Sequence, residues 1–385
     1  MKKDLIMQGT IITTRKGMGY VKNPENPEND IVVEIGSLNT ALNGDIVEVK
    51  LGKINSYKQQ TGEVVRIIKR ARDSFVCVID SREGILTAYP DDKKAYASMR
   101  LSPSDIAKVS IGDKAYVKMR EWTNPKVNPE GDIVRILGKK GNNNVEMESI
   151  VLEKGFEINF PDAVEKEANE IEKNKDSDIA KEIHKRTDFR HTLTFTIDPF
   201  DAKDFDDAIS IKDLKNGNYE IGVHIADVSH YVEIGSALDK EALKRGCSIY
   251  LVDRTIPMLP EVLSNDVCSL NPHEDKLTFS AWFVMNDKGE VLERHFGKTI
   301  INSDHRFTYE DAQEVLNTKS GKYFHELNKL NEIAKVLQKQ KYDNGAIEFE
   351  QEEIKFKLNE NGKPIGVYKK ERLDTHKLVE EYMLL

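Results

Sequence analysis

One run of aspartates constrains this 385-residue chain more than any other stretch. Residues 196–210 place five aspartates within ten positions, and strand-like apolar segments flank the run at 193–197 and 208–211. Carboxylates crowded beside a hydrophobic core repel one another and lose solvation, which disfavours their charged form. A hard divalent cation with oxygen ligands relieves both effects. The run therefore predicts a metal site, and an acidic turn between two strands is the alternative interpretation.

The spacing of the aspartates indicates which cation to expect. An EF-hand calcium loop needs a glycine at its sixth position and a glutamate at its twelfth. Counted from Asp204, these positions hold Ile209 and Lys215, so the spacing excludes such a loop. Mg²⁺ takes few carboxylates, keeps several waters and contacts substrate phosphate. We therefore expect one or two Mg²⁺ ions, since a pair about 3.5–4 Å apart suits phosphodiester hydrolysis.

The run also resembles the signature of the RNB family, the ribonuclease II and ribonuclease R exoribonucleases. That signature reads T-I-D-x-x-D-A-K-D-F-D-D-A, and further segments resemble family blocks in the family's order: 222–232, 245–260, 263–272 and 345–349. Together they are most similar to the ribonuclease R branch. The resemblance implies a Mg²⁺-dependent 3′-to-5′ exoribonuclease that hydrolyses single-stranded RNA to nucleoside 5′-monophosphates.

The resemblance assigns roles to individual aspartates. Four of them match the family's metal-site set: Asp198, Asp204, Asp206 and Asp207. Asp201 matches a common family residue outside that set. Asp198 and Asp207 would be direct ligands, whereas Asp206, with Asp204, would serve the chemical step by positioning water or a second ion. Direct attack by water needs no covalent enzyme intermediate.

Further positions resemble the family's contacts to RNA. Tyr250 matches an aromatic residue that stacks on the 3′-terminal nucleotides, and Phe349 matches its partner. Stacking contributes about 1–3 kcal/mol per base and tolerates any sequence. Core packing is the alternative for both rings. Glu380 or Glu381 matches a glutamate near the nucleotide exit, and the sequence does not distinguish the two.

The sequence of the N-terminal part predicts two consecutive all-β barrels, at 1–58 and 59–155. Both are expected to be OB-folds similar to cold-shock domains. Short alternating runs separated by Gly, Asn and Pro are typical of such barrels. The segment 61–68 is expected to open the second barrel. The pairs Gly44-Asp45 and Gly112-Asp113 introduce a strand in each copy, which indicates a repeat.

RNA contact through the barrels is expected to be weak and directed at the backbone. Residues 16–20 resemble the first RNA-binding motif of cold-shock domains, where aromatic rings stack on bases. This assigns contacts to Lys16, Tyr20 and the basic run 69–72. Ordinary surface cations and a strand aromatic are the alternative.

The remainder predicts a solvated helical connector at 156–186 and the N-terminal part of an α+β RNB catalytic domain at 187–385. The fold class is thus multi-domain, with two barrels ahead of a catalytic domain. The sequence stops at Leu385 on an amphipathic helix. In the family this helix continues into a second half that carries an arginine which stabilises charge on the phosphate. The resemblance therefore implies a C-terminally truncated member whose own activity is in doubt, or one whose missing half is supplied in trans.

Composition agrees with a cytoplasmic protein without a membrane segment. The net charge is −9, the mean hydropathy is −0.54, and no window reaches the roughly 18 apolar residues of a membrane span. The N-terminus lacks the apolar core of a signal peptide. The three cysteines are scattered and have no metal-type spacing. His224, Asp227 and His230 are interpreted as a buried strand and turn with a structural histidine, not as a second metal site.

Three hypotheses follow. The first is an RNB-family exoribonuclease. The second is a non-catalytic RNA-binding module that uses only its barrels. The third is a structural protein that binds Ca²⁺ or Mg²⁺ and no nucleic acid.

Overall fold

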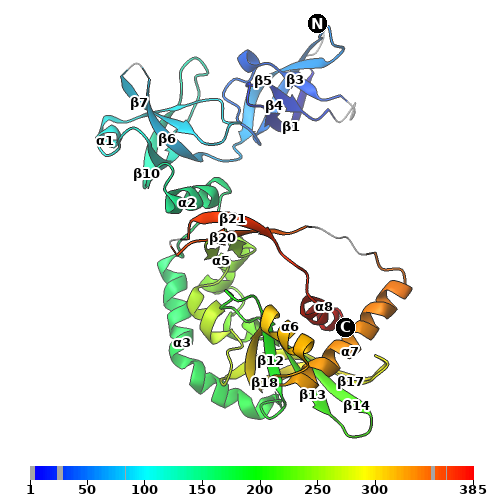
Figure 1. Cartoon of the computed structure of the whole chain (residues 1–385). Coiled ribbons are helices and arrows are strands. Elements are labelled where there is room, and N and C mark those ends of the chain that lie inside the picture. Colours follow the sequence, from blue (N-terminus) through cyan, green and yellow to red (C-terminus); the bar gives the residue numbers. More distant parts are fainter. Residues whose placement is uncertain (1–4, 24–28, 83, 348–351, 361) are drawn as a thin grey trace. The chain divides into compact units, whose positions relative to one another are not determined.

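Short strands dominate the N-terminal unit, Met1–Ile158, whereas the C-terminal unit, Asn159–Leu385, is built on one large sheet (Figure 1). The computed structural model describes residues 5–23, 29–82, 84–347, 352–360 and 362–385. Among these residues no helix combines the length and the apolar character needed to cross a bilayer.

The first barrel closes in the strand order β1-β2-β3-β5-β4. Its strands are β1 (Ile6–Thr13), β2 (Gly19–Val21), β3 (Ile31–Val33), β4 (Ile46–Ile54) and β5 (Gln60–Lys69). Alternation along β4 buries Val47 and Val49, which pack with Ile11 and Val64 in the barrel core. The expected barrel is confirmed.

The boundary expected at residue 58 is wrong. Strand β5, predicted to open the second barrel, instead pairs antiparallel with β4 and closes the first one. The side chain of Asn55 accepts hydrogen bonds from the amides of Tyr57 and Gln59 and so turns the chain back between these strands. The first barrel therefore extends to Lys69.

The second barrel repeats this topology, with the ring order β10-β8-β7-β6-β9. Its strands are β6 (Ser74–Arg82), β7 (Ile85–Pro90), β8 (Met99–Leu101), β9 (Asp113–Met119) and β10 (Glu130–Lys139), with the short helix α1 (Pro103–Ile106) before β9. A helix that the sequence did not predict, α2 (Asn143–Glu153), follows β10. The nearly buried Lys114 ammonium binds Glu146 of α2 at 2.5 Å, which ties this helix to the barrel.

The Gly-Asp pairs serve the same purpose in both barrels. Gly44 and Gly112 adopt positive φ angles of 89° and 83°, which glycine reaches without strain. The aspartate after each glycine accepts a hydrogen bond from the amide three residues before it. Asp45 accepts from the amide of Leu42, and Asp113 accepts from the amide of Ser110. Each pair thus forms the tight turn that leads into the fourth strand.

The C-terminal unit contains a seven-stranded mixed sheet in the order β11-β18-β17-β14-β13-β12-β19. These strands are β11 (Thr187–Asp188), β12 (Thr194–Asp198), β13 (Asp207–Asp213), β14 (Asn218–Ala226), β17 (Asp275–Asn286), β18 (Val291–Asn302) and β19 (His305–Thr308). Two small hairpins complete the strands: β15 (Ile249–Tyr250) with β16 (Thr255–Ile256), and β20 (Ile354–Leu358) with β21 (Pro364–Lys369). Strand β12 is buried along its whole length.

Helices supply two hydrophobic cores around this sheet. Helices α6 (Tyr309–Thr318), α7 (Phe324–Asp343) and α8 (Asp374–Met383) share one core with alternate residues of the strands, among them Ile209 and Phe283. Thr308 caps α6, because its hydroxyl accepts the amide of Asp311.

The second core contains α3 (Asp162–Glu182), α5 (Ala237–Arg245) and residues around the short α4 (Val228–Tyr231). Helix α3 corrects the expectation of a merely solvated connector, since Val164 and Ala168 are buried. Its Glu167 carboxylate accepts the amides of Ala237 and Leu238 at the start of α5. An acidic side chain at a helix N-terminus stabilises that helix, so α3 is an integral part of the unit.

Candidate active site

The aspartate run connects two neighbouring antiparallel strands. Asp198 is the last residue of β12 and Asp207 is the first of β13, while Phe195 of β12 pairs with Ile209 of β13. In an antiparallel pair, the last residue of one strand and the first residue of the next lie at the same end of the sheet. The two carboxylates therefore lie at one end of the sheet. The intervening loop, 199–206, carries the remaining aspartates.

The pKa values of three of these carboxylates are raised by burial and by the charges of neighbouring aspartates. Burial raises the pKa of Asp198 to about 7, with the charges of Asp207 and Asp204 adding to the effect. Burial and the charge of Asp206 raise the pKa of Asp207 to about 6. The pKa of Asp206 is raised by partial desolvation and by Asp204. The four aspartates predicted from the sequence therefore interact with one another at the end of the sheet.

A divalent cation would fit the donor chemistry of this site. Asp198 is buried, and its Oδ2 has no hydrogen-bond partner among the described residues. A buried carboxylate oxygen without a partner is costly unless something positive pairs with it. The part of the chain that the structure describes holds no group of three or more His, Cys, Asp or Glu side chains already arranged around a metal position. The negative charges of the aspartates and the unpaired Asp198 Oδ2 are thus the features of the site that suit a divalent cation.

Backbone contacts fix the loop at both ends. The Arg306 guanidinium donates to the carbonyl oxygens of Pro199 and Phe200 at 2.6 and 2.8 Å. At the other end, the Ser269 hydroxyl donates to the carbonyl of Lys203 and accepts the amide of Phe205. The sequence interpretation assigned no role to Arg306 or Ser269.

Tyr250 lies beside the aspartates. Its ring is 70% exposed, which excludes the alternative of core packing. Its hydroxyl is 3.5 Å from Asp204 Oδ2, and burial and the charges of Asp204 and Asp206 raise its pKa. An exposed aromatic face next to an acidic site is suited to stacking on a base. Phe349, its expected partner, lies outside the described residues.

Tyr309 is a site residue that the sequence interpretation missed. It follows Thr308, which pairs with Asp198 across β19 and β12. Burial and the charges of Asp207 and Asp198 raise its pKa to about 12. Its ring stacks on His376 of α8 with centroids 3.9 Å apart. The signal was the position of Tyr309 in the first turn of a helix, but the parallel pairing of β19 with β12 cannot be read from local sequence.

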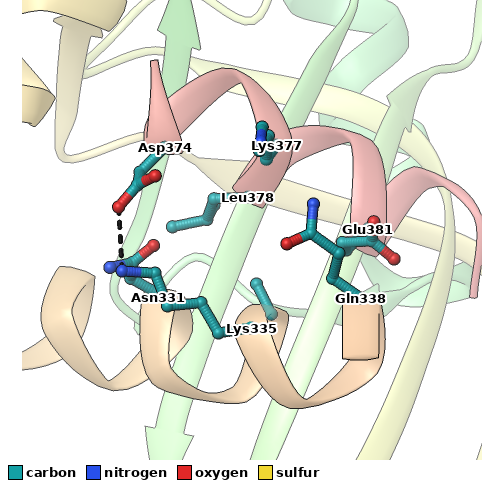
Figure 2. Close-up of a pocket in the computed structure, with 8 residues that line it drawn as sticks. Asn331, Lys335, Gln338, Asp374, Lys377, Leu378 and Glu381 are labelled. Carbon is teal, nitrogen blue, oxygen red and sulfur yellow. Dashed lines mark ion pairs between the residues drawn. The ribbon is translucent and has the colours of Figure 1, made fainter. Parts of the chain in front are cut away.

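The two glutamates assigned to a nucleotide exit lie on α8 and pair with cations of the same unit. Glu381 is buried and its carboxylate is 2.5 Å from the Lys341 ammonium, while Glu380 pairs with Lys341 and Arg372. Figure 2 shows Glu381 beside Gln338 at a small pocket between α7 and α8. The pocket volume of about 10 Å³ has room for one water at most, so no nucleotide could enter it. The exit role stays a prediction.

The residues assigned to RNA contact in the first barrel differ in exposure. Lys16 is exposed and Tyr20 is half-buried on β2. In the basic run, Arg70 binds the buried carboxylate of Asp45 at 2.6 Å. Arg72 pairs with Asp92 and Glu153. These two arginines hold the barrel structure together, so only Lys69 of the basic run stays a candidate for RNA contact, beside Lys16 and Tyr20.

His224 and Asp227 have the structural surroundings predicted for them. His224 is fully buried, and its two ring nitrogens lie 2.7 and 2.8 Å from the hydroxyls of Ser280 and Ser210. Asp227 pairs with the buried Arg186 guanidinium at 2.8 Å.

Comparison with known proteins agrees with this organisation. Three family models match: "RNB domain" over 186–385, "Cold shock domain" over 89–161 and "Ribonuclease B OB domain" over 9–67. The chain is similar to ribonuclease R of Thermotoga maritima, with 36% identity over 98% of this chain and 53% of that protein. The chain thus spans about half the length of the curated relatives it matches.

Solved structures share the fold. RNase R of Mycoplasma genitalium in complex with ribose-methylated single-stranded RNA superposes with a TM-score of 0.89 and 27% identity, over 98% of this chain and 60% of that one. Yeast Ssd1, described as a pseudonuclease, superposes with a TM-score of 0.63 and 18% identity, over 88% of this chain and 48% of that one. The latter likeness concerns the fold alone.

Proposed function

Because the chain belongs to the RNB family, we propose that it carries out 3′-to-5′ hydrolysis of single-stranded RNA and releases nucleoside 5′-monophosphates. The observation that carries the proposal is the group of four coupled aspartates at the end of β12 and the start of β13, beside an exposed tyrosine. The RNA bound to the Mycoplasma genitalium relative supports the choice of substrate.

Asp198 and Asp207 would hold Mg²⁺, together with Asp204. The ion supplies charge neutralisation at the scissile phosphate when it is bound. Asp206, the last residue of the loop, would position the attacking water, the role that the family signature implies for it. The exposed ring of Tyr250 stacks on a terminal base without reading its identity.

A second candidate function is RNA binding without hydrolysis. The fold accommodates it, because Ssd1 shares the fold and is described as a pseudonuclease. The two candidates differ in one outcome, which is whether phosphodiester bonds break when a divalent cation is present.

The test uses single-stranded RNA labelled at its last phosphodiester, incubated with the chain and Mg²⁺. Early release of labelled mononucleotide, abolished by a chelator, is the expected result. A gel shift without release would favour the second candidate. Neither release nor a gel shift would contradict both and favour a structural cation-binding protein.

A further inference from the structure

The loop that carries the aspartates is held by a cation from another strand. We propose that Arg306 is a positioning residue that fixes the loop 199–206, so that its aspartates converge before a divalent cation arrives. This inference rests on the proposed function of the aspartate site. It goes beyond that function by naming the residue that shapes the site.

The position of Arg306 in the sheet explains its reach. It lies on the edge strand β19, directly opposite Thr196 of β12 in a parallel pair. β12 ends two residues later, at Asp198, and the loop starts there. A long side chain on the neighbouring strand can therefore extend along β12 and meet the first backbone groups of the loop.

Arg306 contacts the loop through hydrogen bonds and through its position beside an aromatic ring. One guanidinium nitrogen, Nη2, donates to two successive carbonyl oxygens, those of Pro199 and Phe200, at 2.6 and 2.8 Å. The guanidinium carbon also lies 5.3 Å from the ring centroid of Phe205, near the end of the same loop. An arginine combines several fixed donors with a flat cation that can sit over an aromatic ring. Arg306 thus touches the loop at its start and near its end.

The charge of Arg306 acts in the same direction as its contacts. Bringing several carboxylates together before a metal binds is unfavourable because they repel one another. A fixed positive charge beside them reduces that repulsion. The Arg306 cation therefore favours the close approach of the aspartates as well as the loop geometry.

The rest of the loop provides an internal reference. The Ala202 amide donates to the Pro199 carbonyl at 3.1 Å, close to the Arg306 contacts. The Phe205 amide donates to the buried Ser269 hydroxyl at 3.0 Å. If Arg306 positions the start of the loop, its loss should free the amide of Ala202 more than that of Phe205.

The test compares Arg306→Met, Arg306→Lys and the control Arg294→Met, which removes an exposed arginine on β18. Hydrogen exchange by mass spectrometry follows peptides that cover 199–206, and titration with Mn²⁺ alone measures cation binding. Thermal unfolding checks that each variant folds. Partners that orient metal ligands typically change affinity by about 10- to 100-fold. We expect Arg306→Met to speed exchange at the start of the loop and to weaken Mn²⁺ binding by about that factor.

For Arg306→Lys we expect an exchange rate and a Mn²⁺ affinity between those of the unchanged chain and those of Arg306→Met. A lysine keeps the charge but cannot offer the same set of donors. Arg294→Met should match the unchanged chain in both measurements. Unchanged exchange and unchanged Mn²⁺ binding in Arg306→Met would overturn the proposal. Faster exchange in the loop with no Mn²⁺ bound by any variant would support the positioning role and overturn the metal site instead.

Discussion

Asp206 and Asp213 lie at opposite ends of β13 and differ in surroundings. Asp206 precedes β13 and senses Asp204, whereas Asp213 ends that strand and bonds to Lys215 in a solvent-exposed turn. We predict that Asp206→Asn lowers the RNA cleavage rate by about 100-fold or more, since loss of one well-placed catalytic group typically has that effect. Binding of RNA in the presence of a chelator should not change.

Asp213→Asn is the matched control, because it removes the same charge from the opposite end of β13. Its cleavage rate should equal that of the unchanged chain. A normal cleavage rate in Asp206→Asn would contradict the site assignment.

His224 predicts a specific dependence of stability on pH. Complete burial lowers its pKa to about 3, whereas it is about 6.5 in the unfolded chain. Between these values the unfolded state binds a proton that the folded state does not, so the free energy of unfolding falls as pH drops below about 6.5. One such group contributes at most about 1.4 kcal/mol per pH unit.

Urea unfolding of the unchanged chain and of His224→Gln between pH 4 and pH 7 measures the free energy of unfolding. The slopes of this free energy against pH are then compared. The variant should lose this part of the pH dependence, whatever its stability at pH 7. Equal slopes would show that His224 takes up its proton in the folded state.

Among the structural elements, one buried ion pair joins the segment between α3 and β11 to the turn after β14. The side chains of Arg186 and Asp227 are both 1% exposed and lie 2.8 Å apart, and Arg186 also donates to the carbonyl of Thr278. We predict that Arg186→Met lowers the free energy of unfolding by about 3–5 kcal/mol, because it leaves a carboxylate buried without its close partner.

Arg190→Met is the control for this prediction. Arg190 pairs with Asp188 and Asp275 at the surface, where such pairs contribute about 0–1 kcal/mol. Urea unfolding followed by fluorescence would measure both variants. Similar losses in the two would contradict the argument from burial.

Elements with a regular local pattern could be predicted, and elements fixed by distant partners could not. The alternation of buried and exposed residues in β4 acts over a few residues, and alternating runs of this kind predicted the barrels. Strand β5 was assigned to the wrong barrel because its own sequence does not specify which neighbour it pairs with. Helix α2 was missed because its anchor, the Lys114–Glu146 ion pair, joins residues 32 positions apart.

The same distinction applies to the site. The aspartates occupy one continuous run, so the sequence places them in a single loop and its flanking strands. Arg306 and Ser269 contact that loop, and Tyr309 lies near the aspartates that flank it. All three are 60 or more positions away from the loop in the sequence. Only the strand order of the sheet brings them together. A local reading therefore finds the chemical groups and misses the residues that orient them.

At the scale of the whole molecule, each unit has cores of its own. Among the residues that the structure describes, four clusters of buried apolar residues each lie within one unit, two in Met1–Ile158 and two in Asn159–Leu385. Segments with separate cores can unfold in separate transitions. The chain offers a probe for each, because its two tryptophans are Trp122 in the first unit and Trp282 in the second.

We predict that Trp122→Phe and Trp282→Phe, each of which leaves one tryptophan to be excited selectively, report different urea midpoints. Arg186→Met, added to each, should lower only the Trp282 midpoint, by about 1–2 M, given its expected loss of stability and the usual slope for urea. The reason is that Arg186 and Asp227 both lie in the second unit, so their loss does not touch the barrel cores. An equal shift at Trp122 would show that the barrels and the catalytic sheet unfold as one cooperative body.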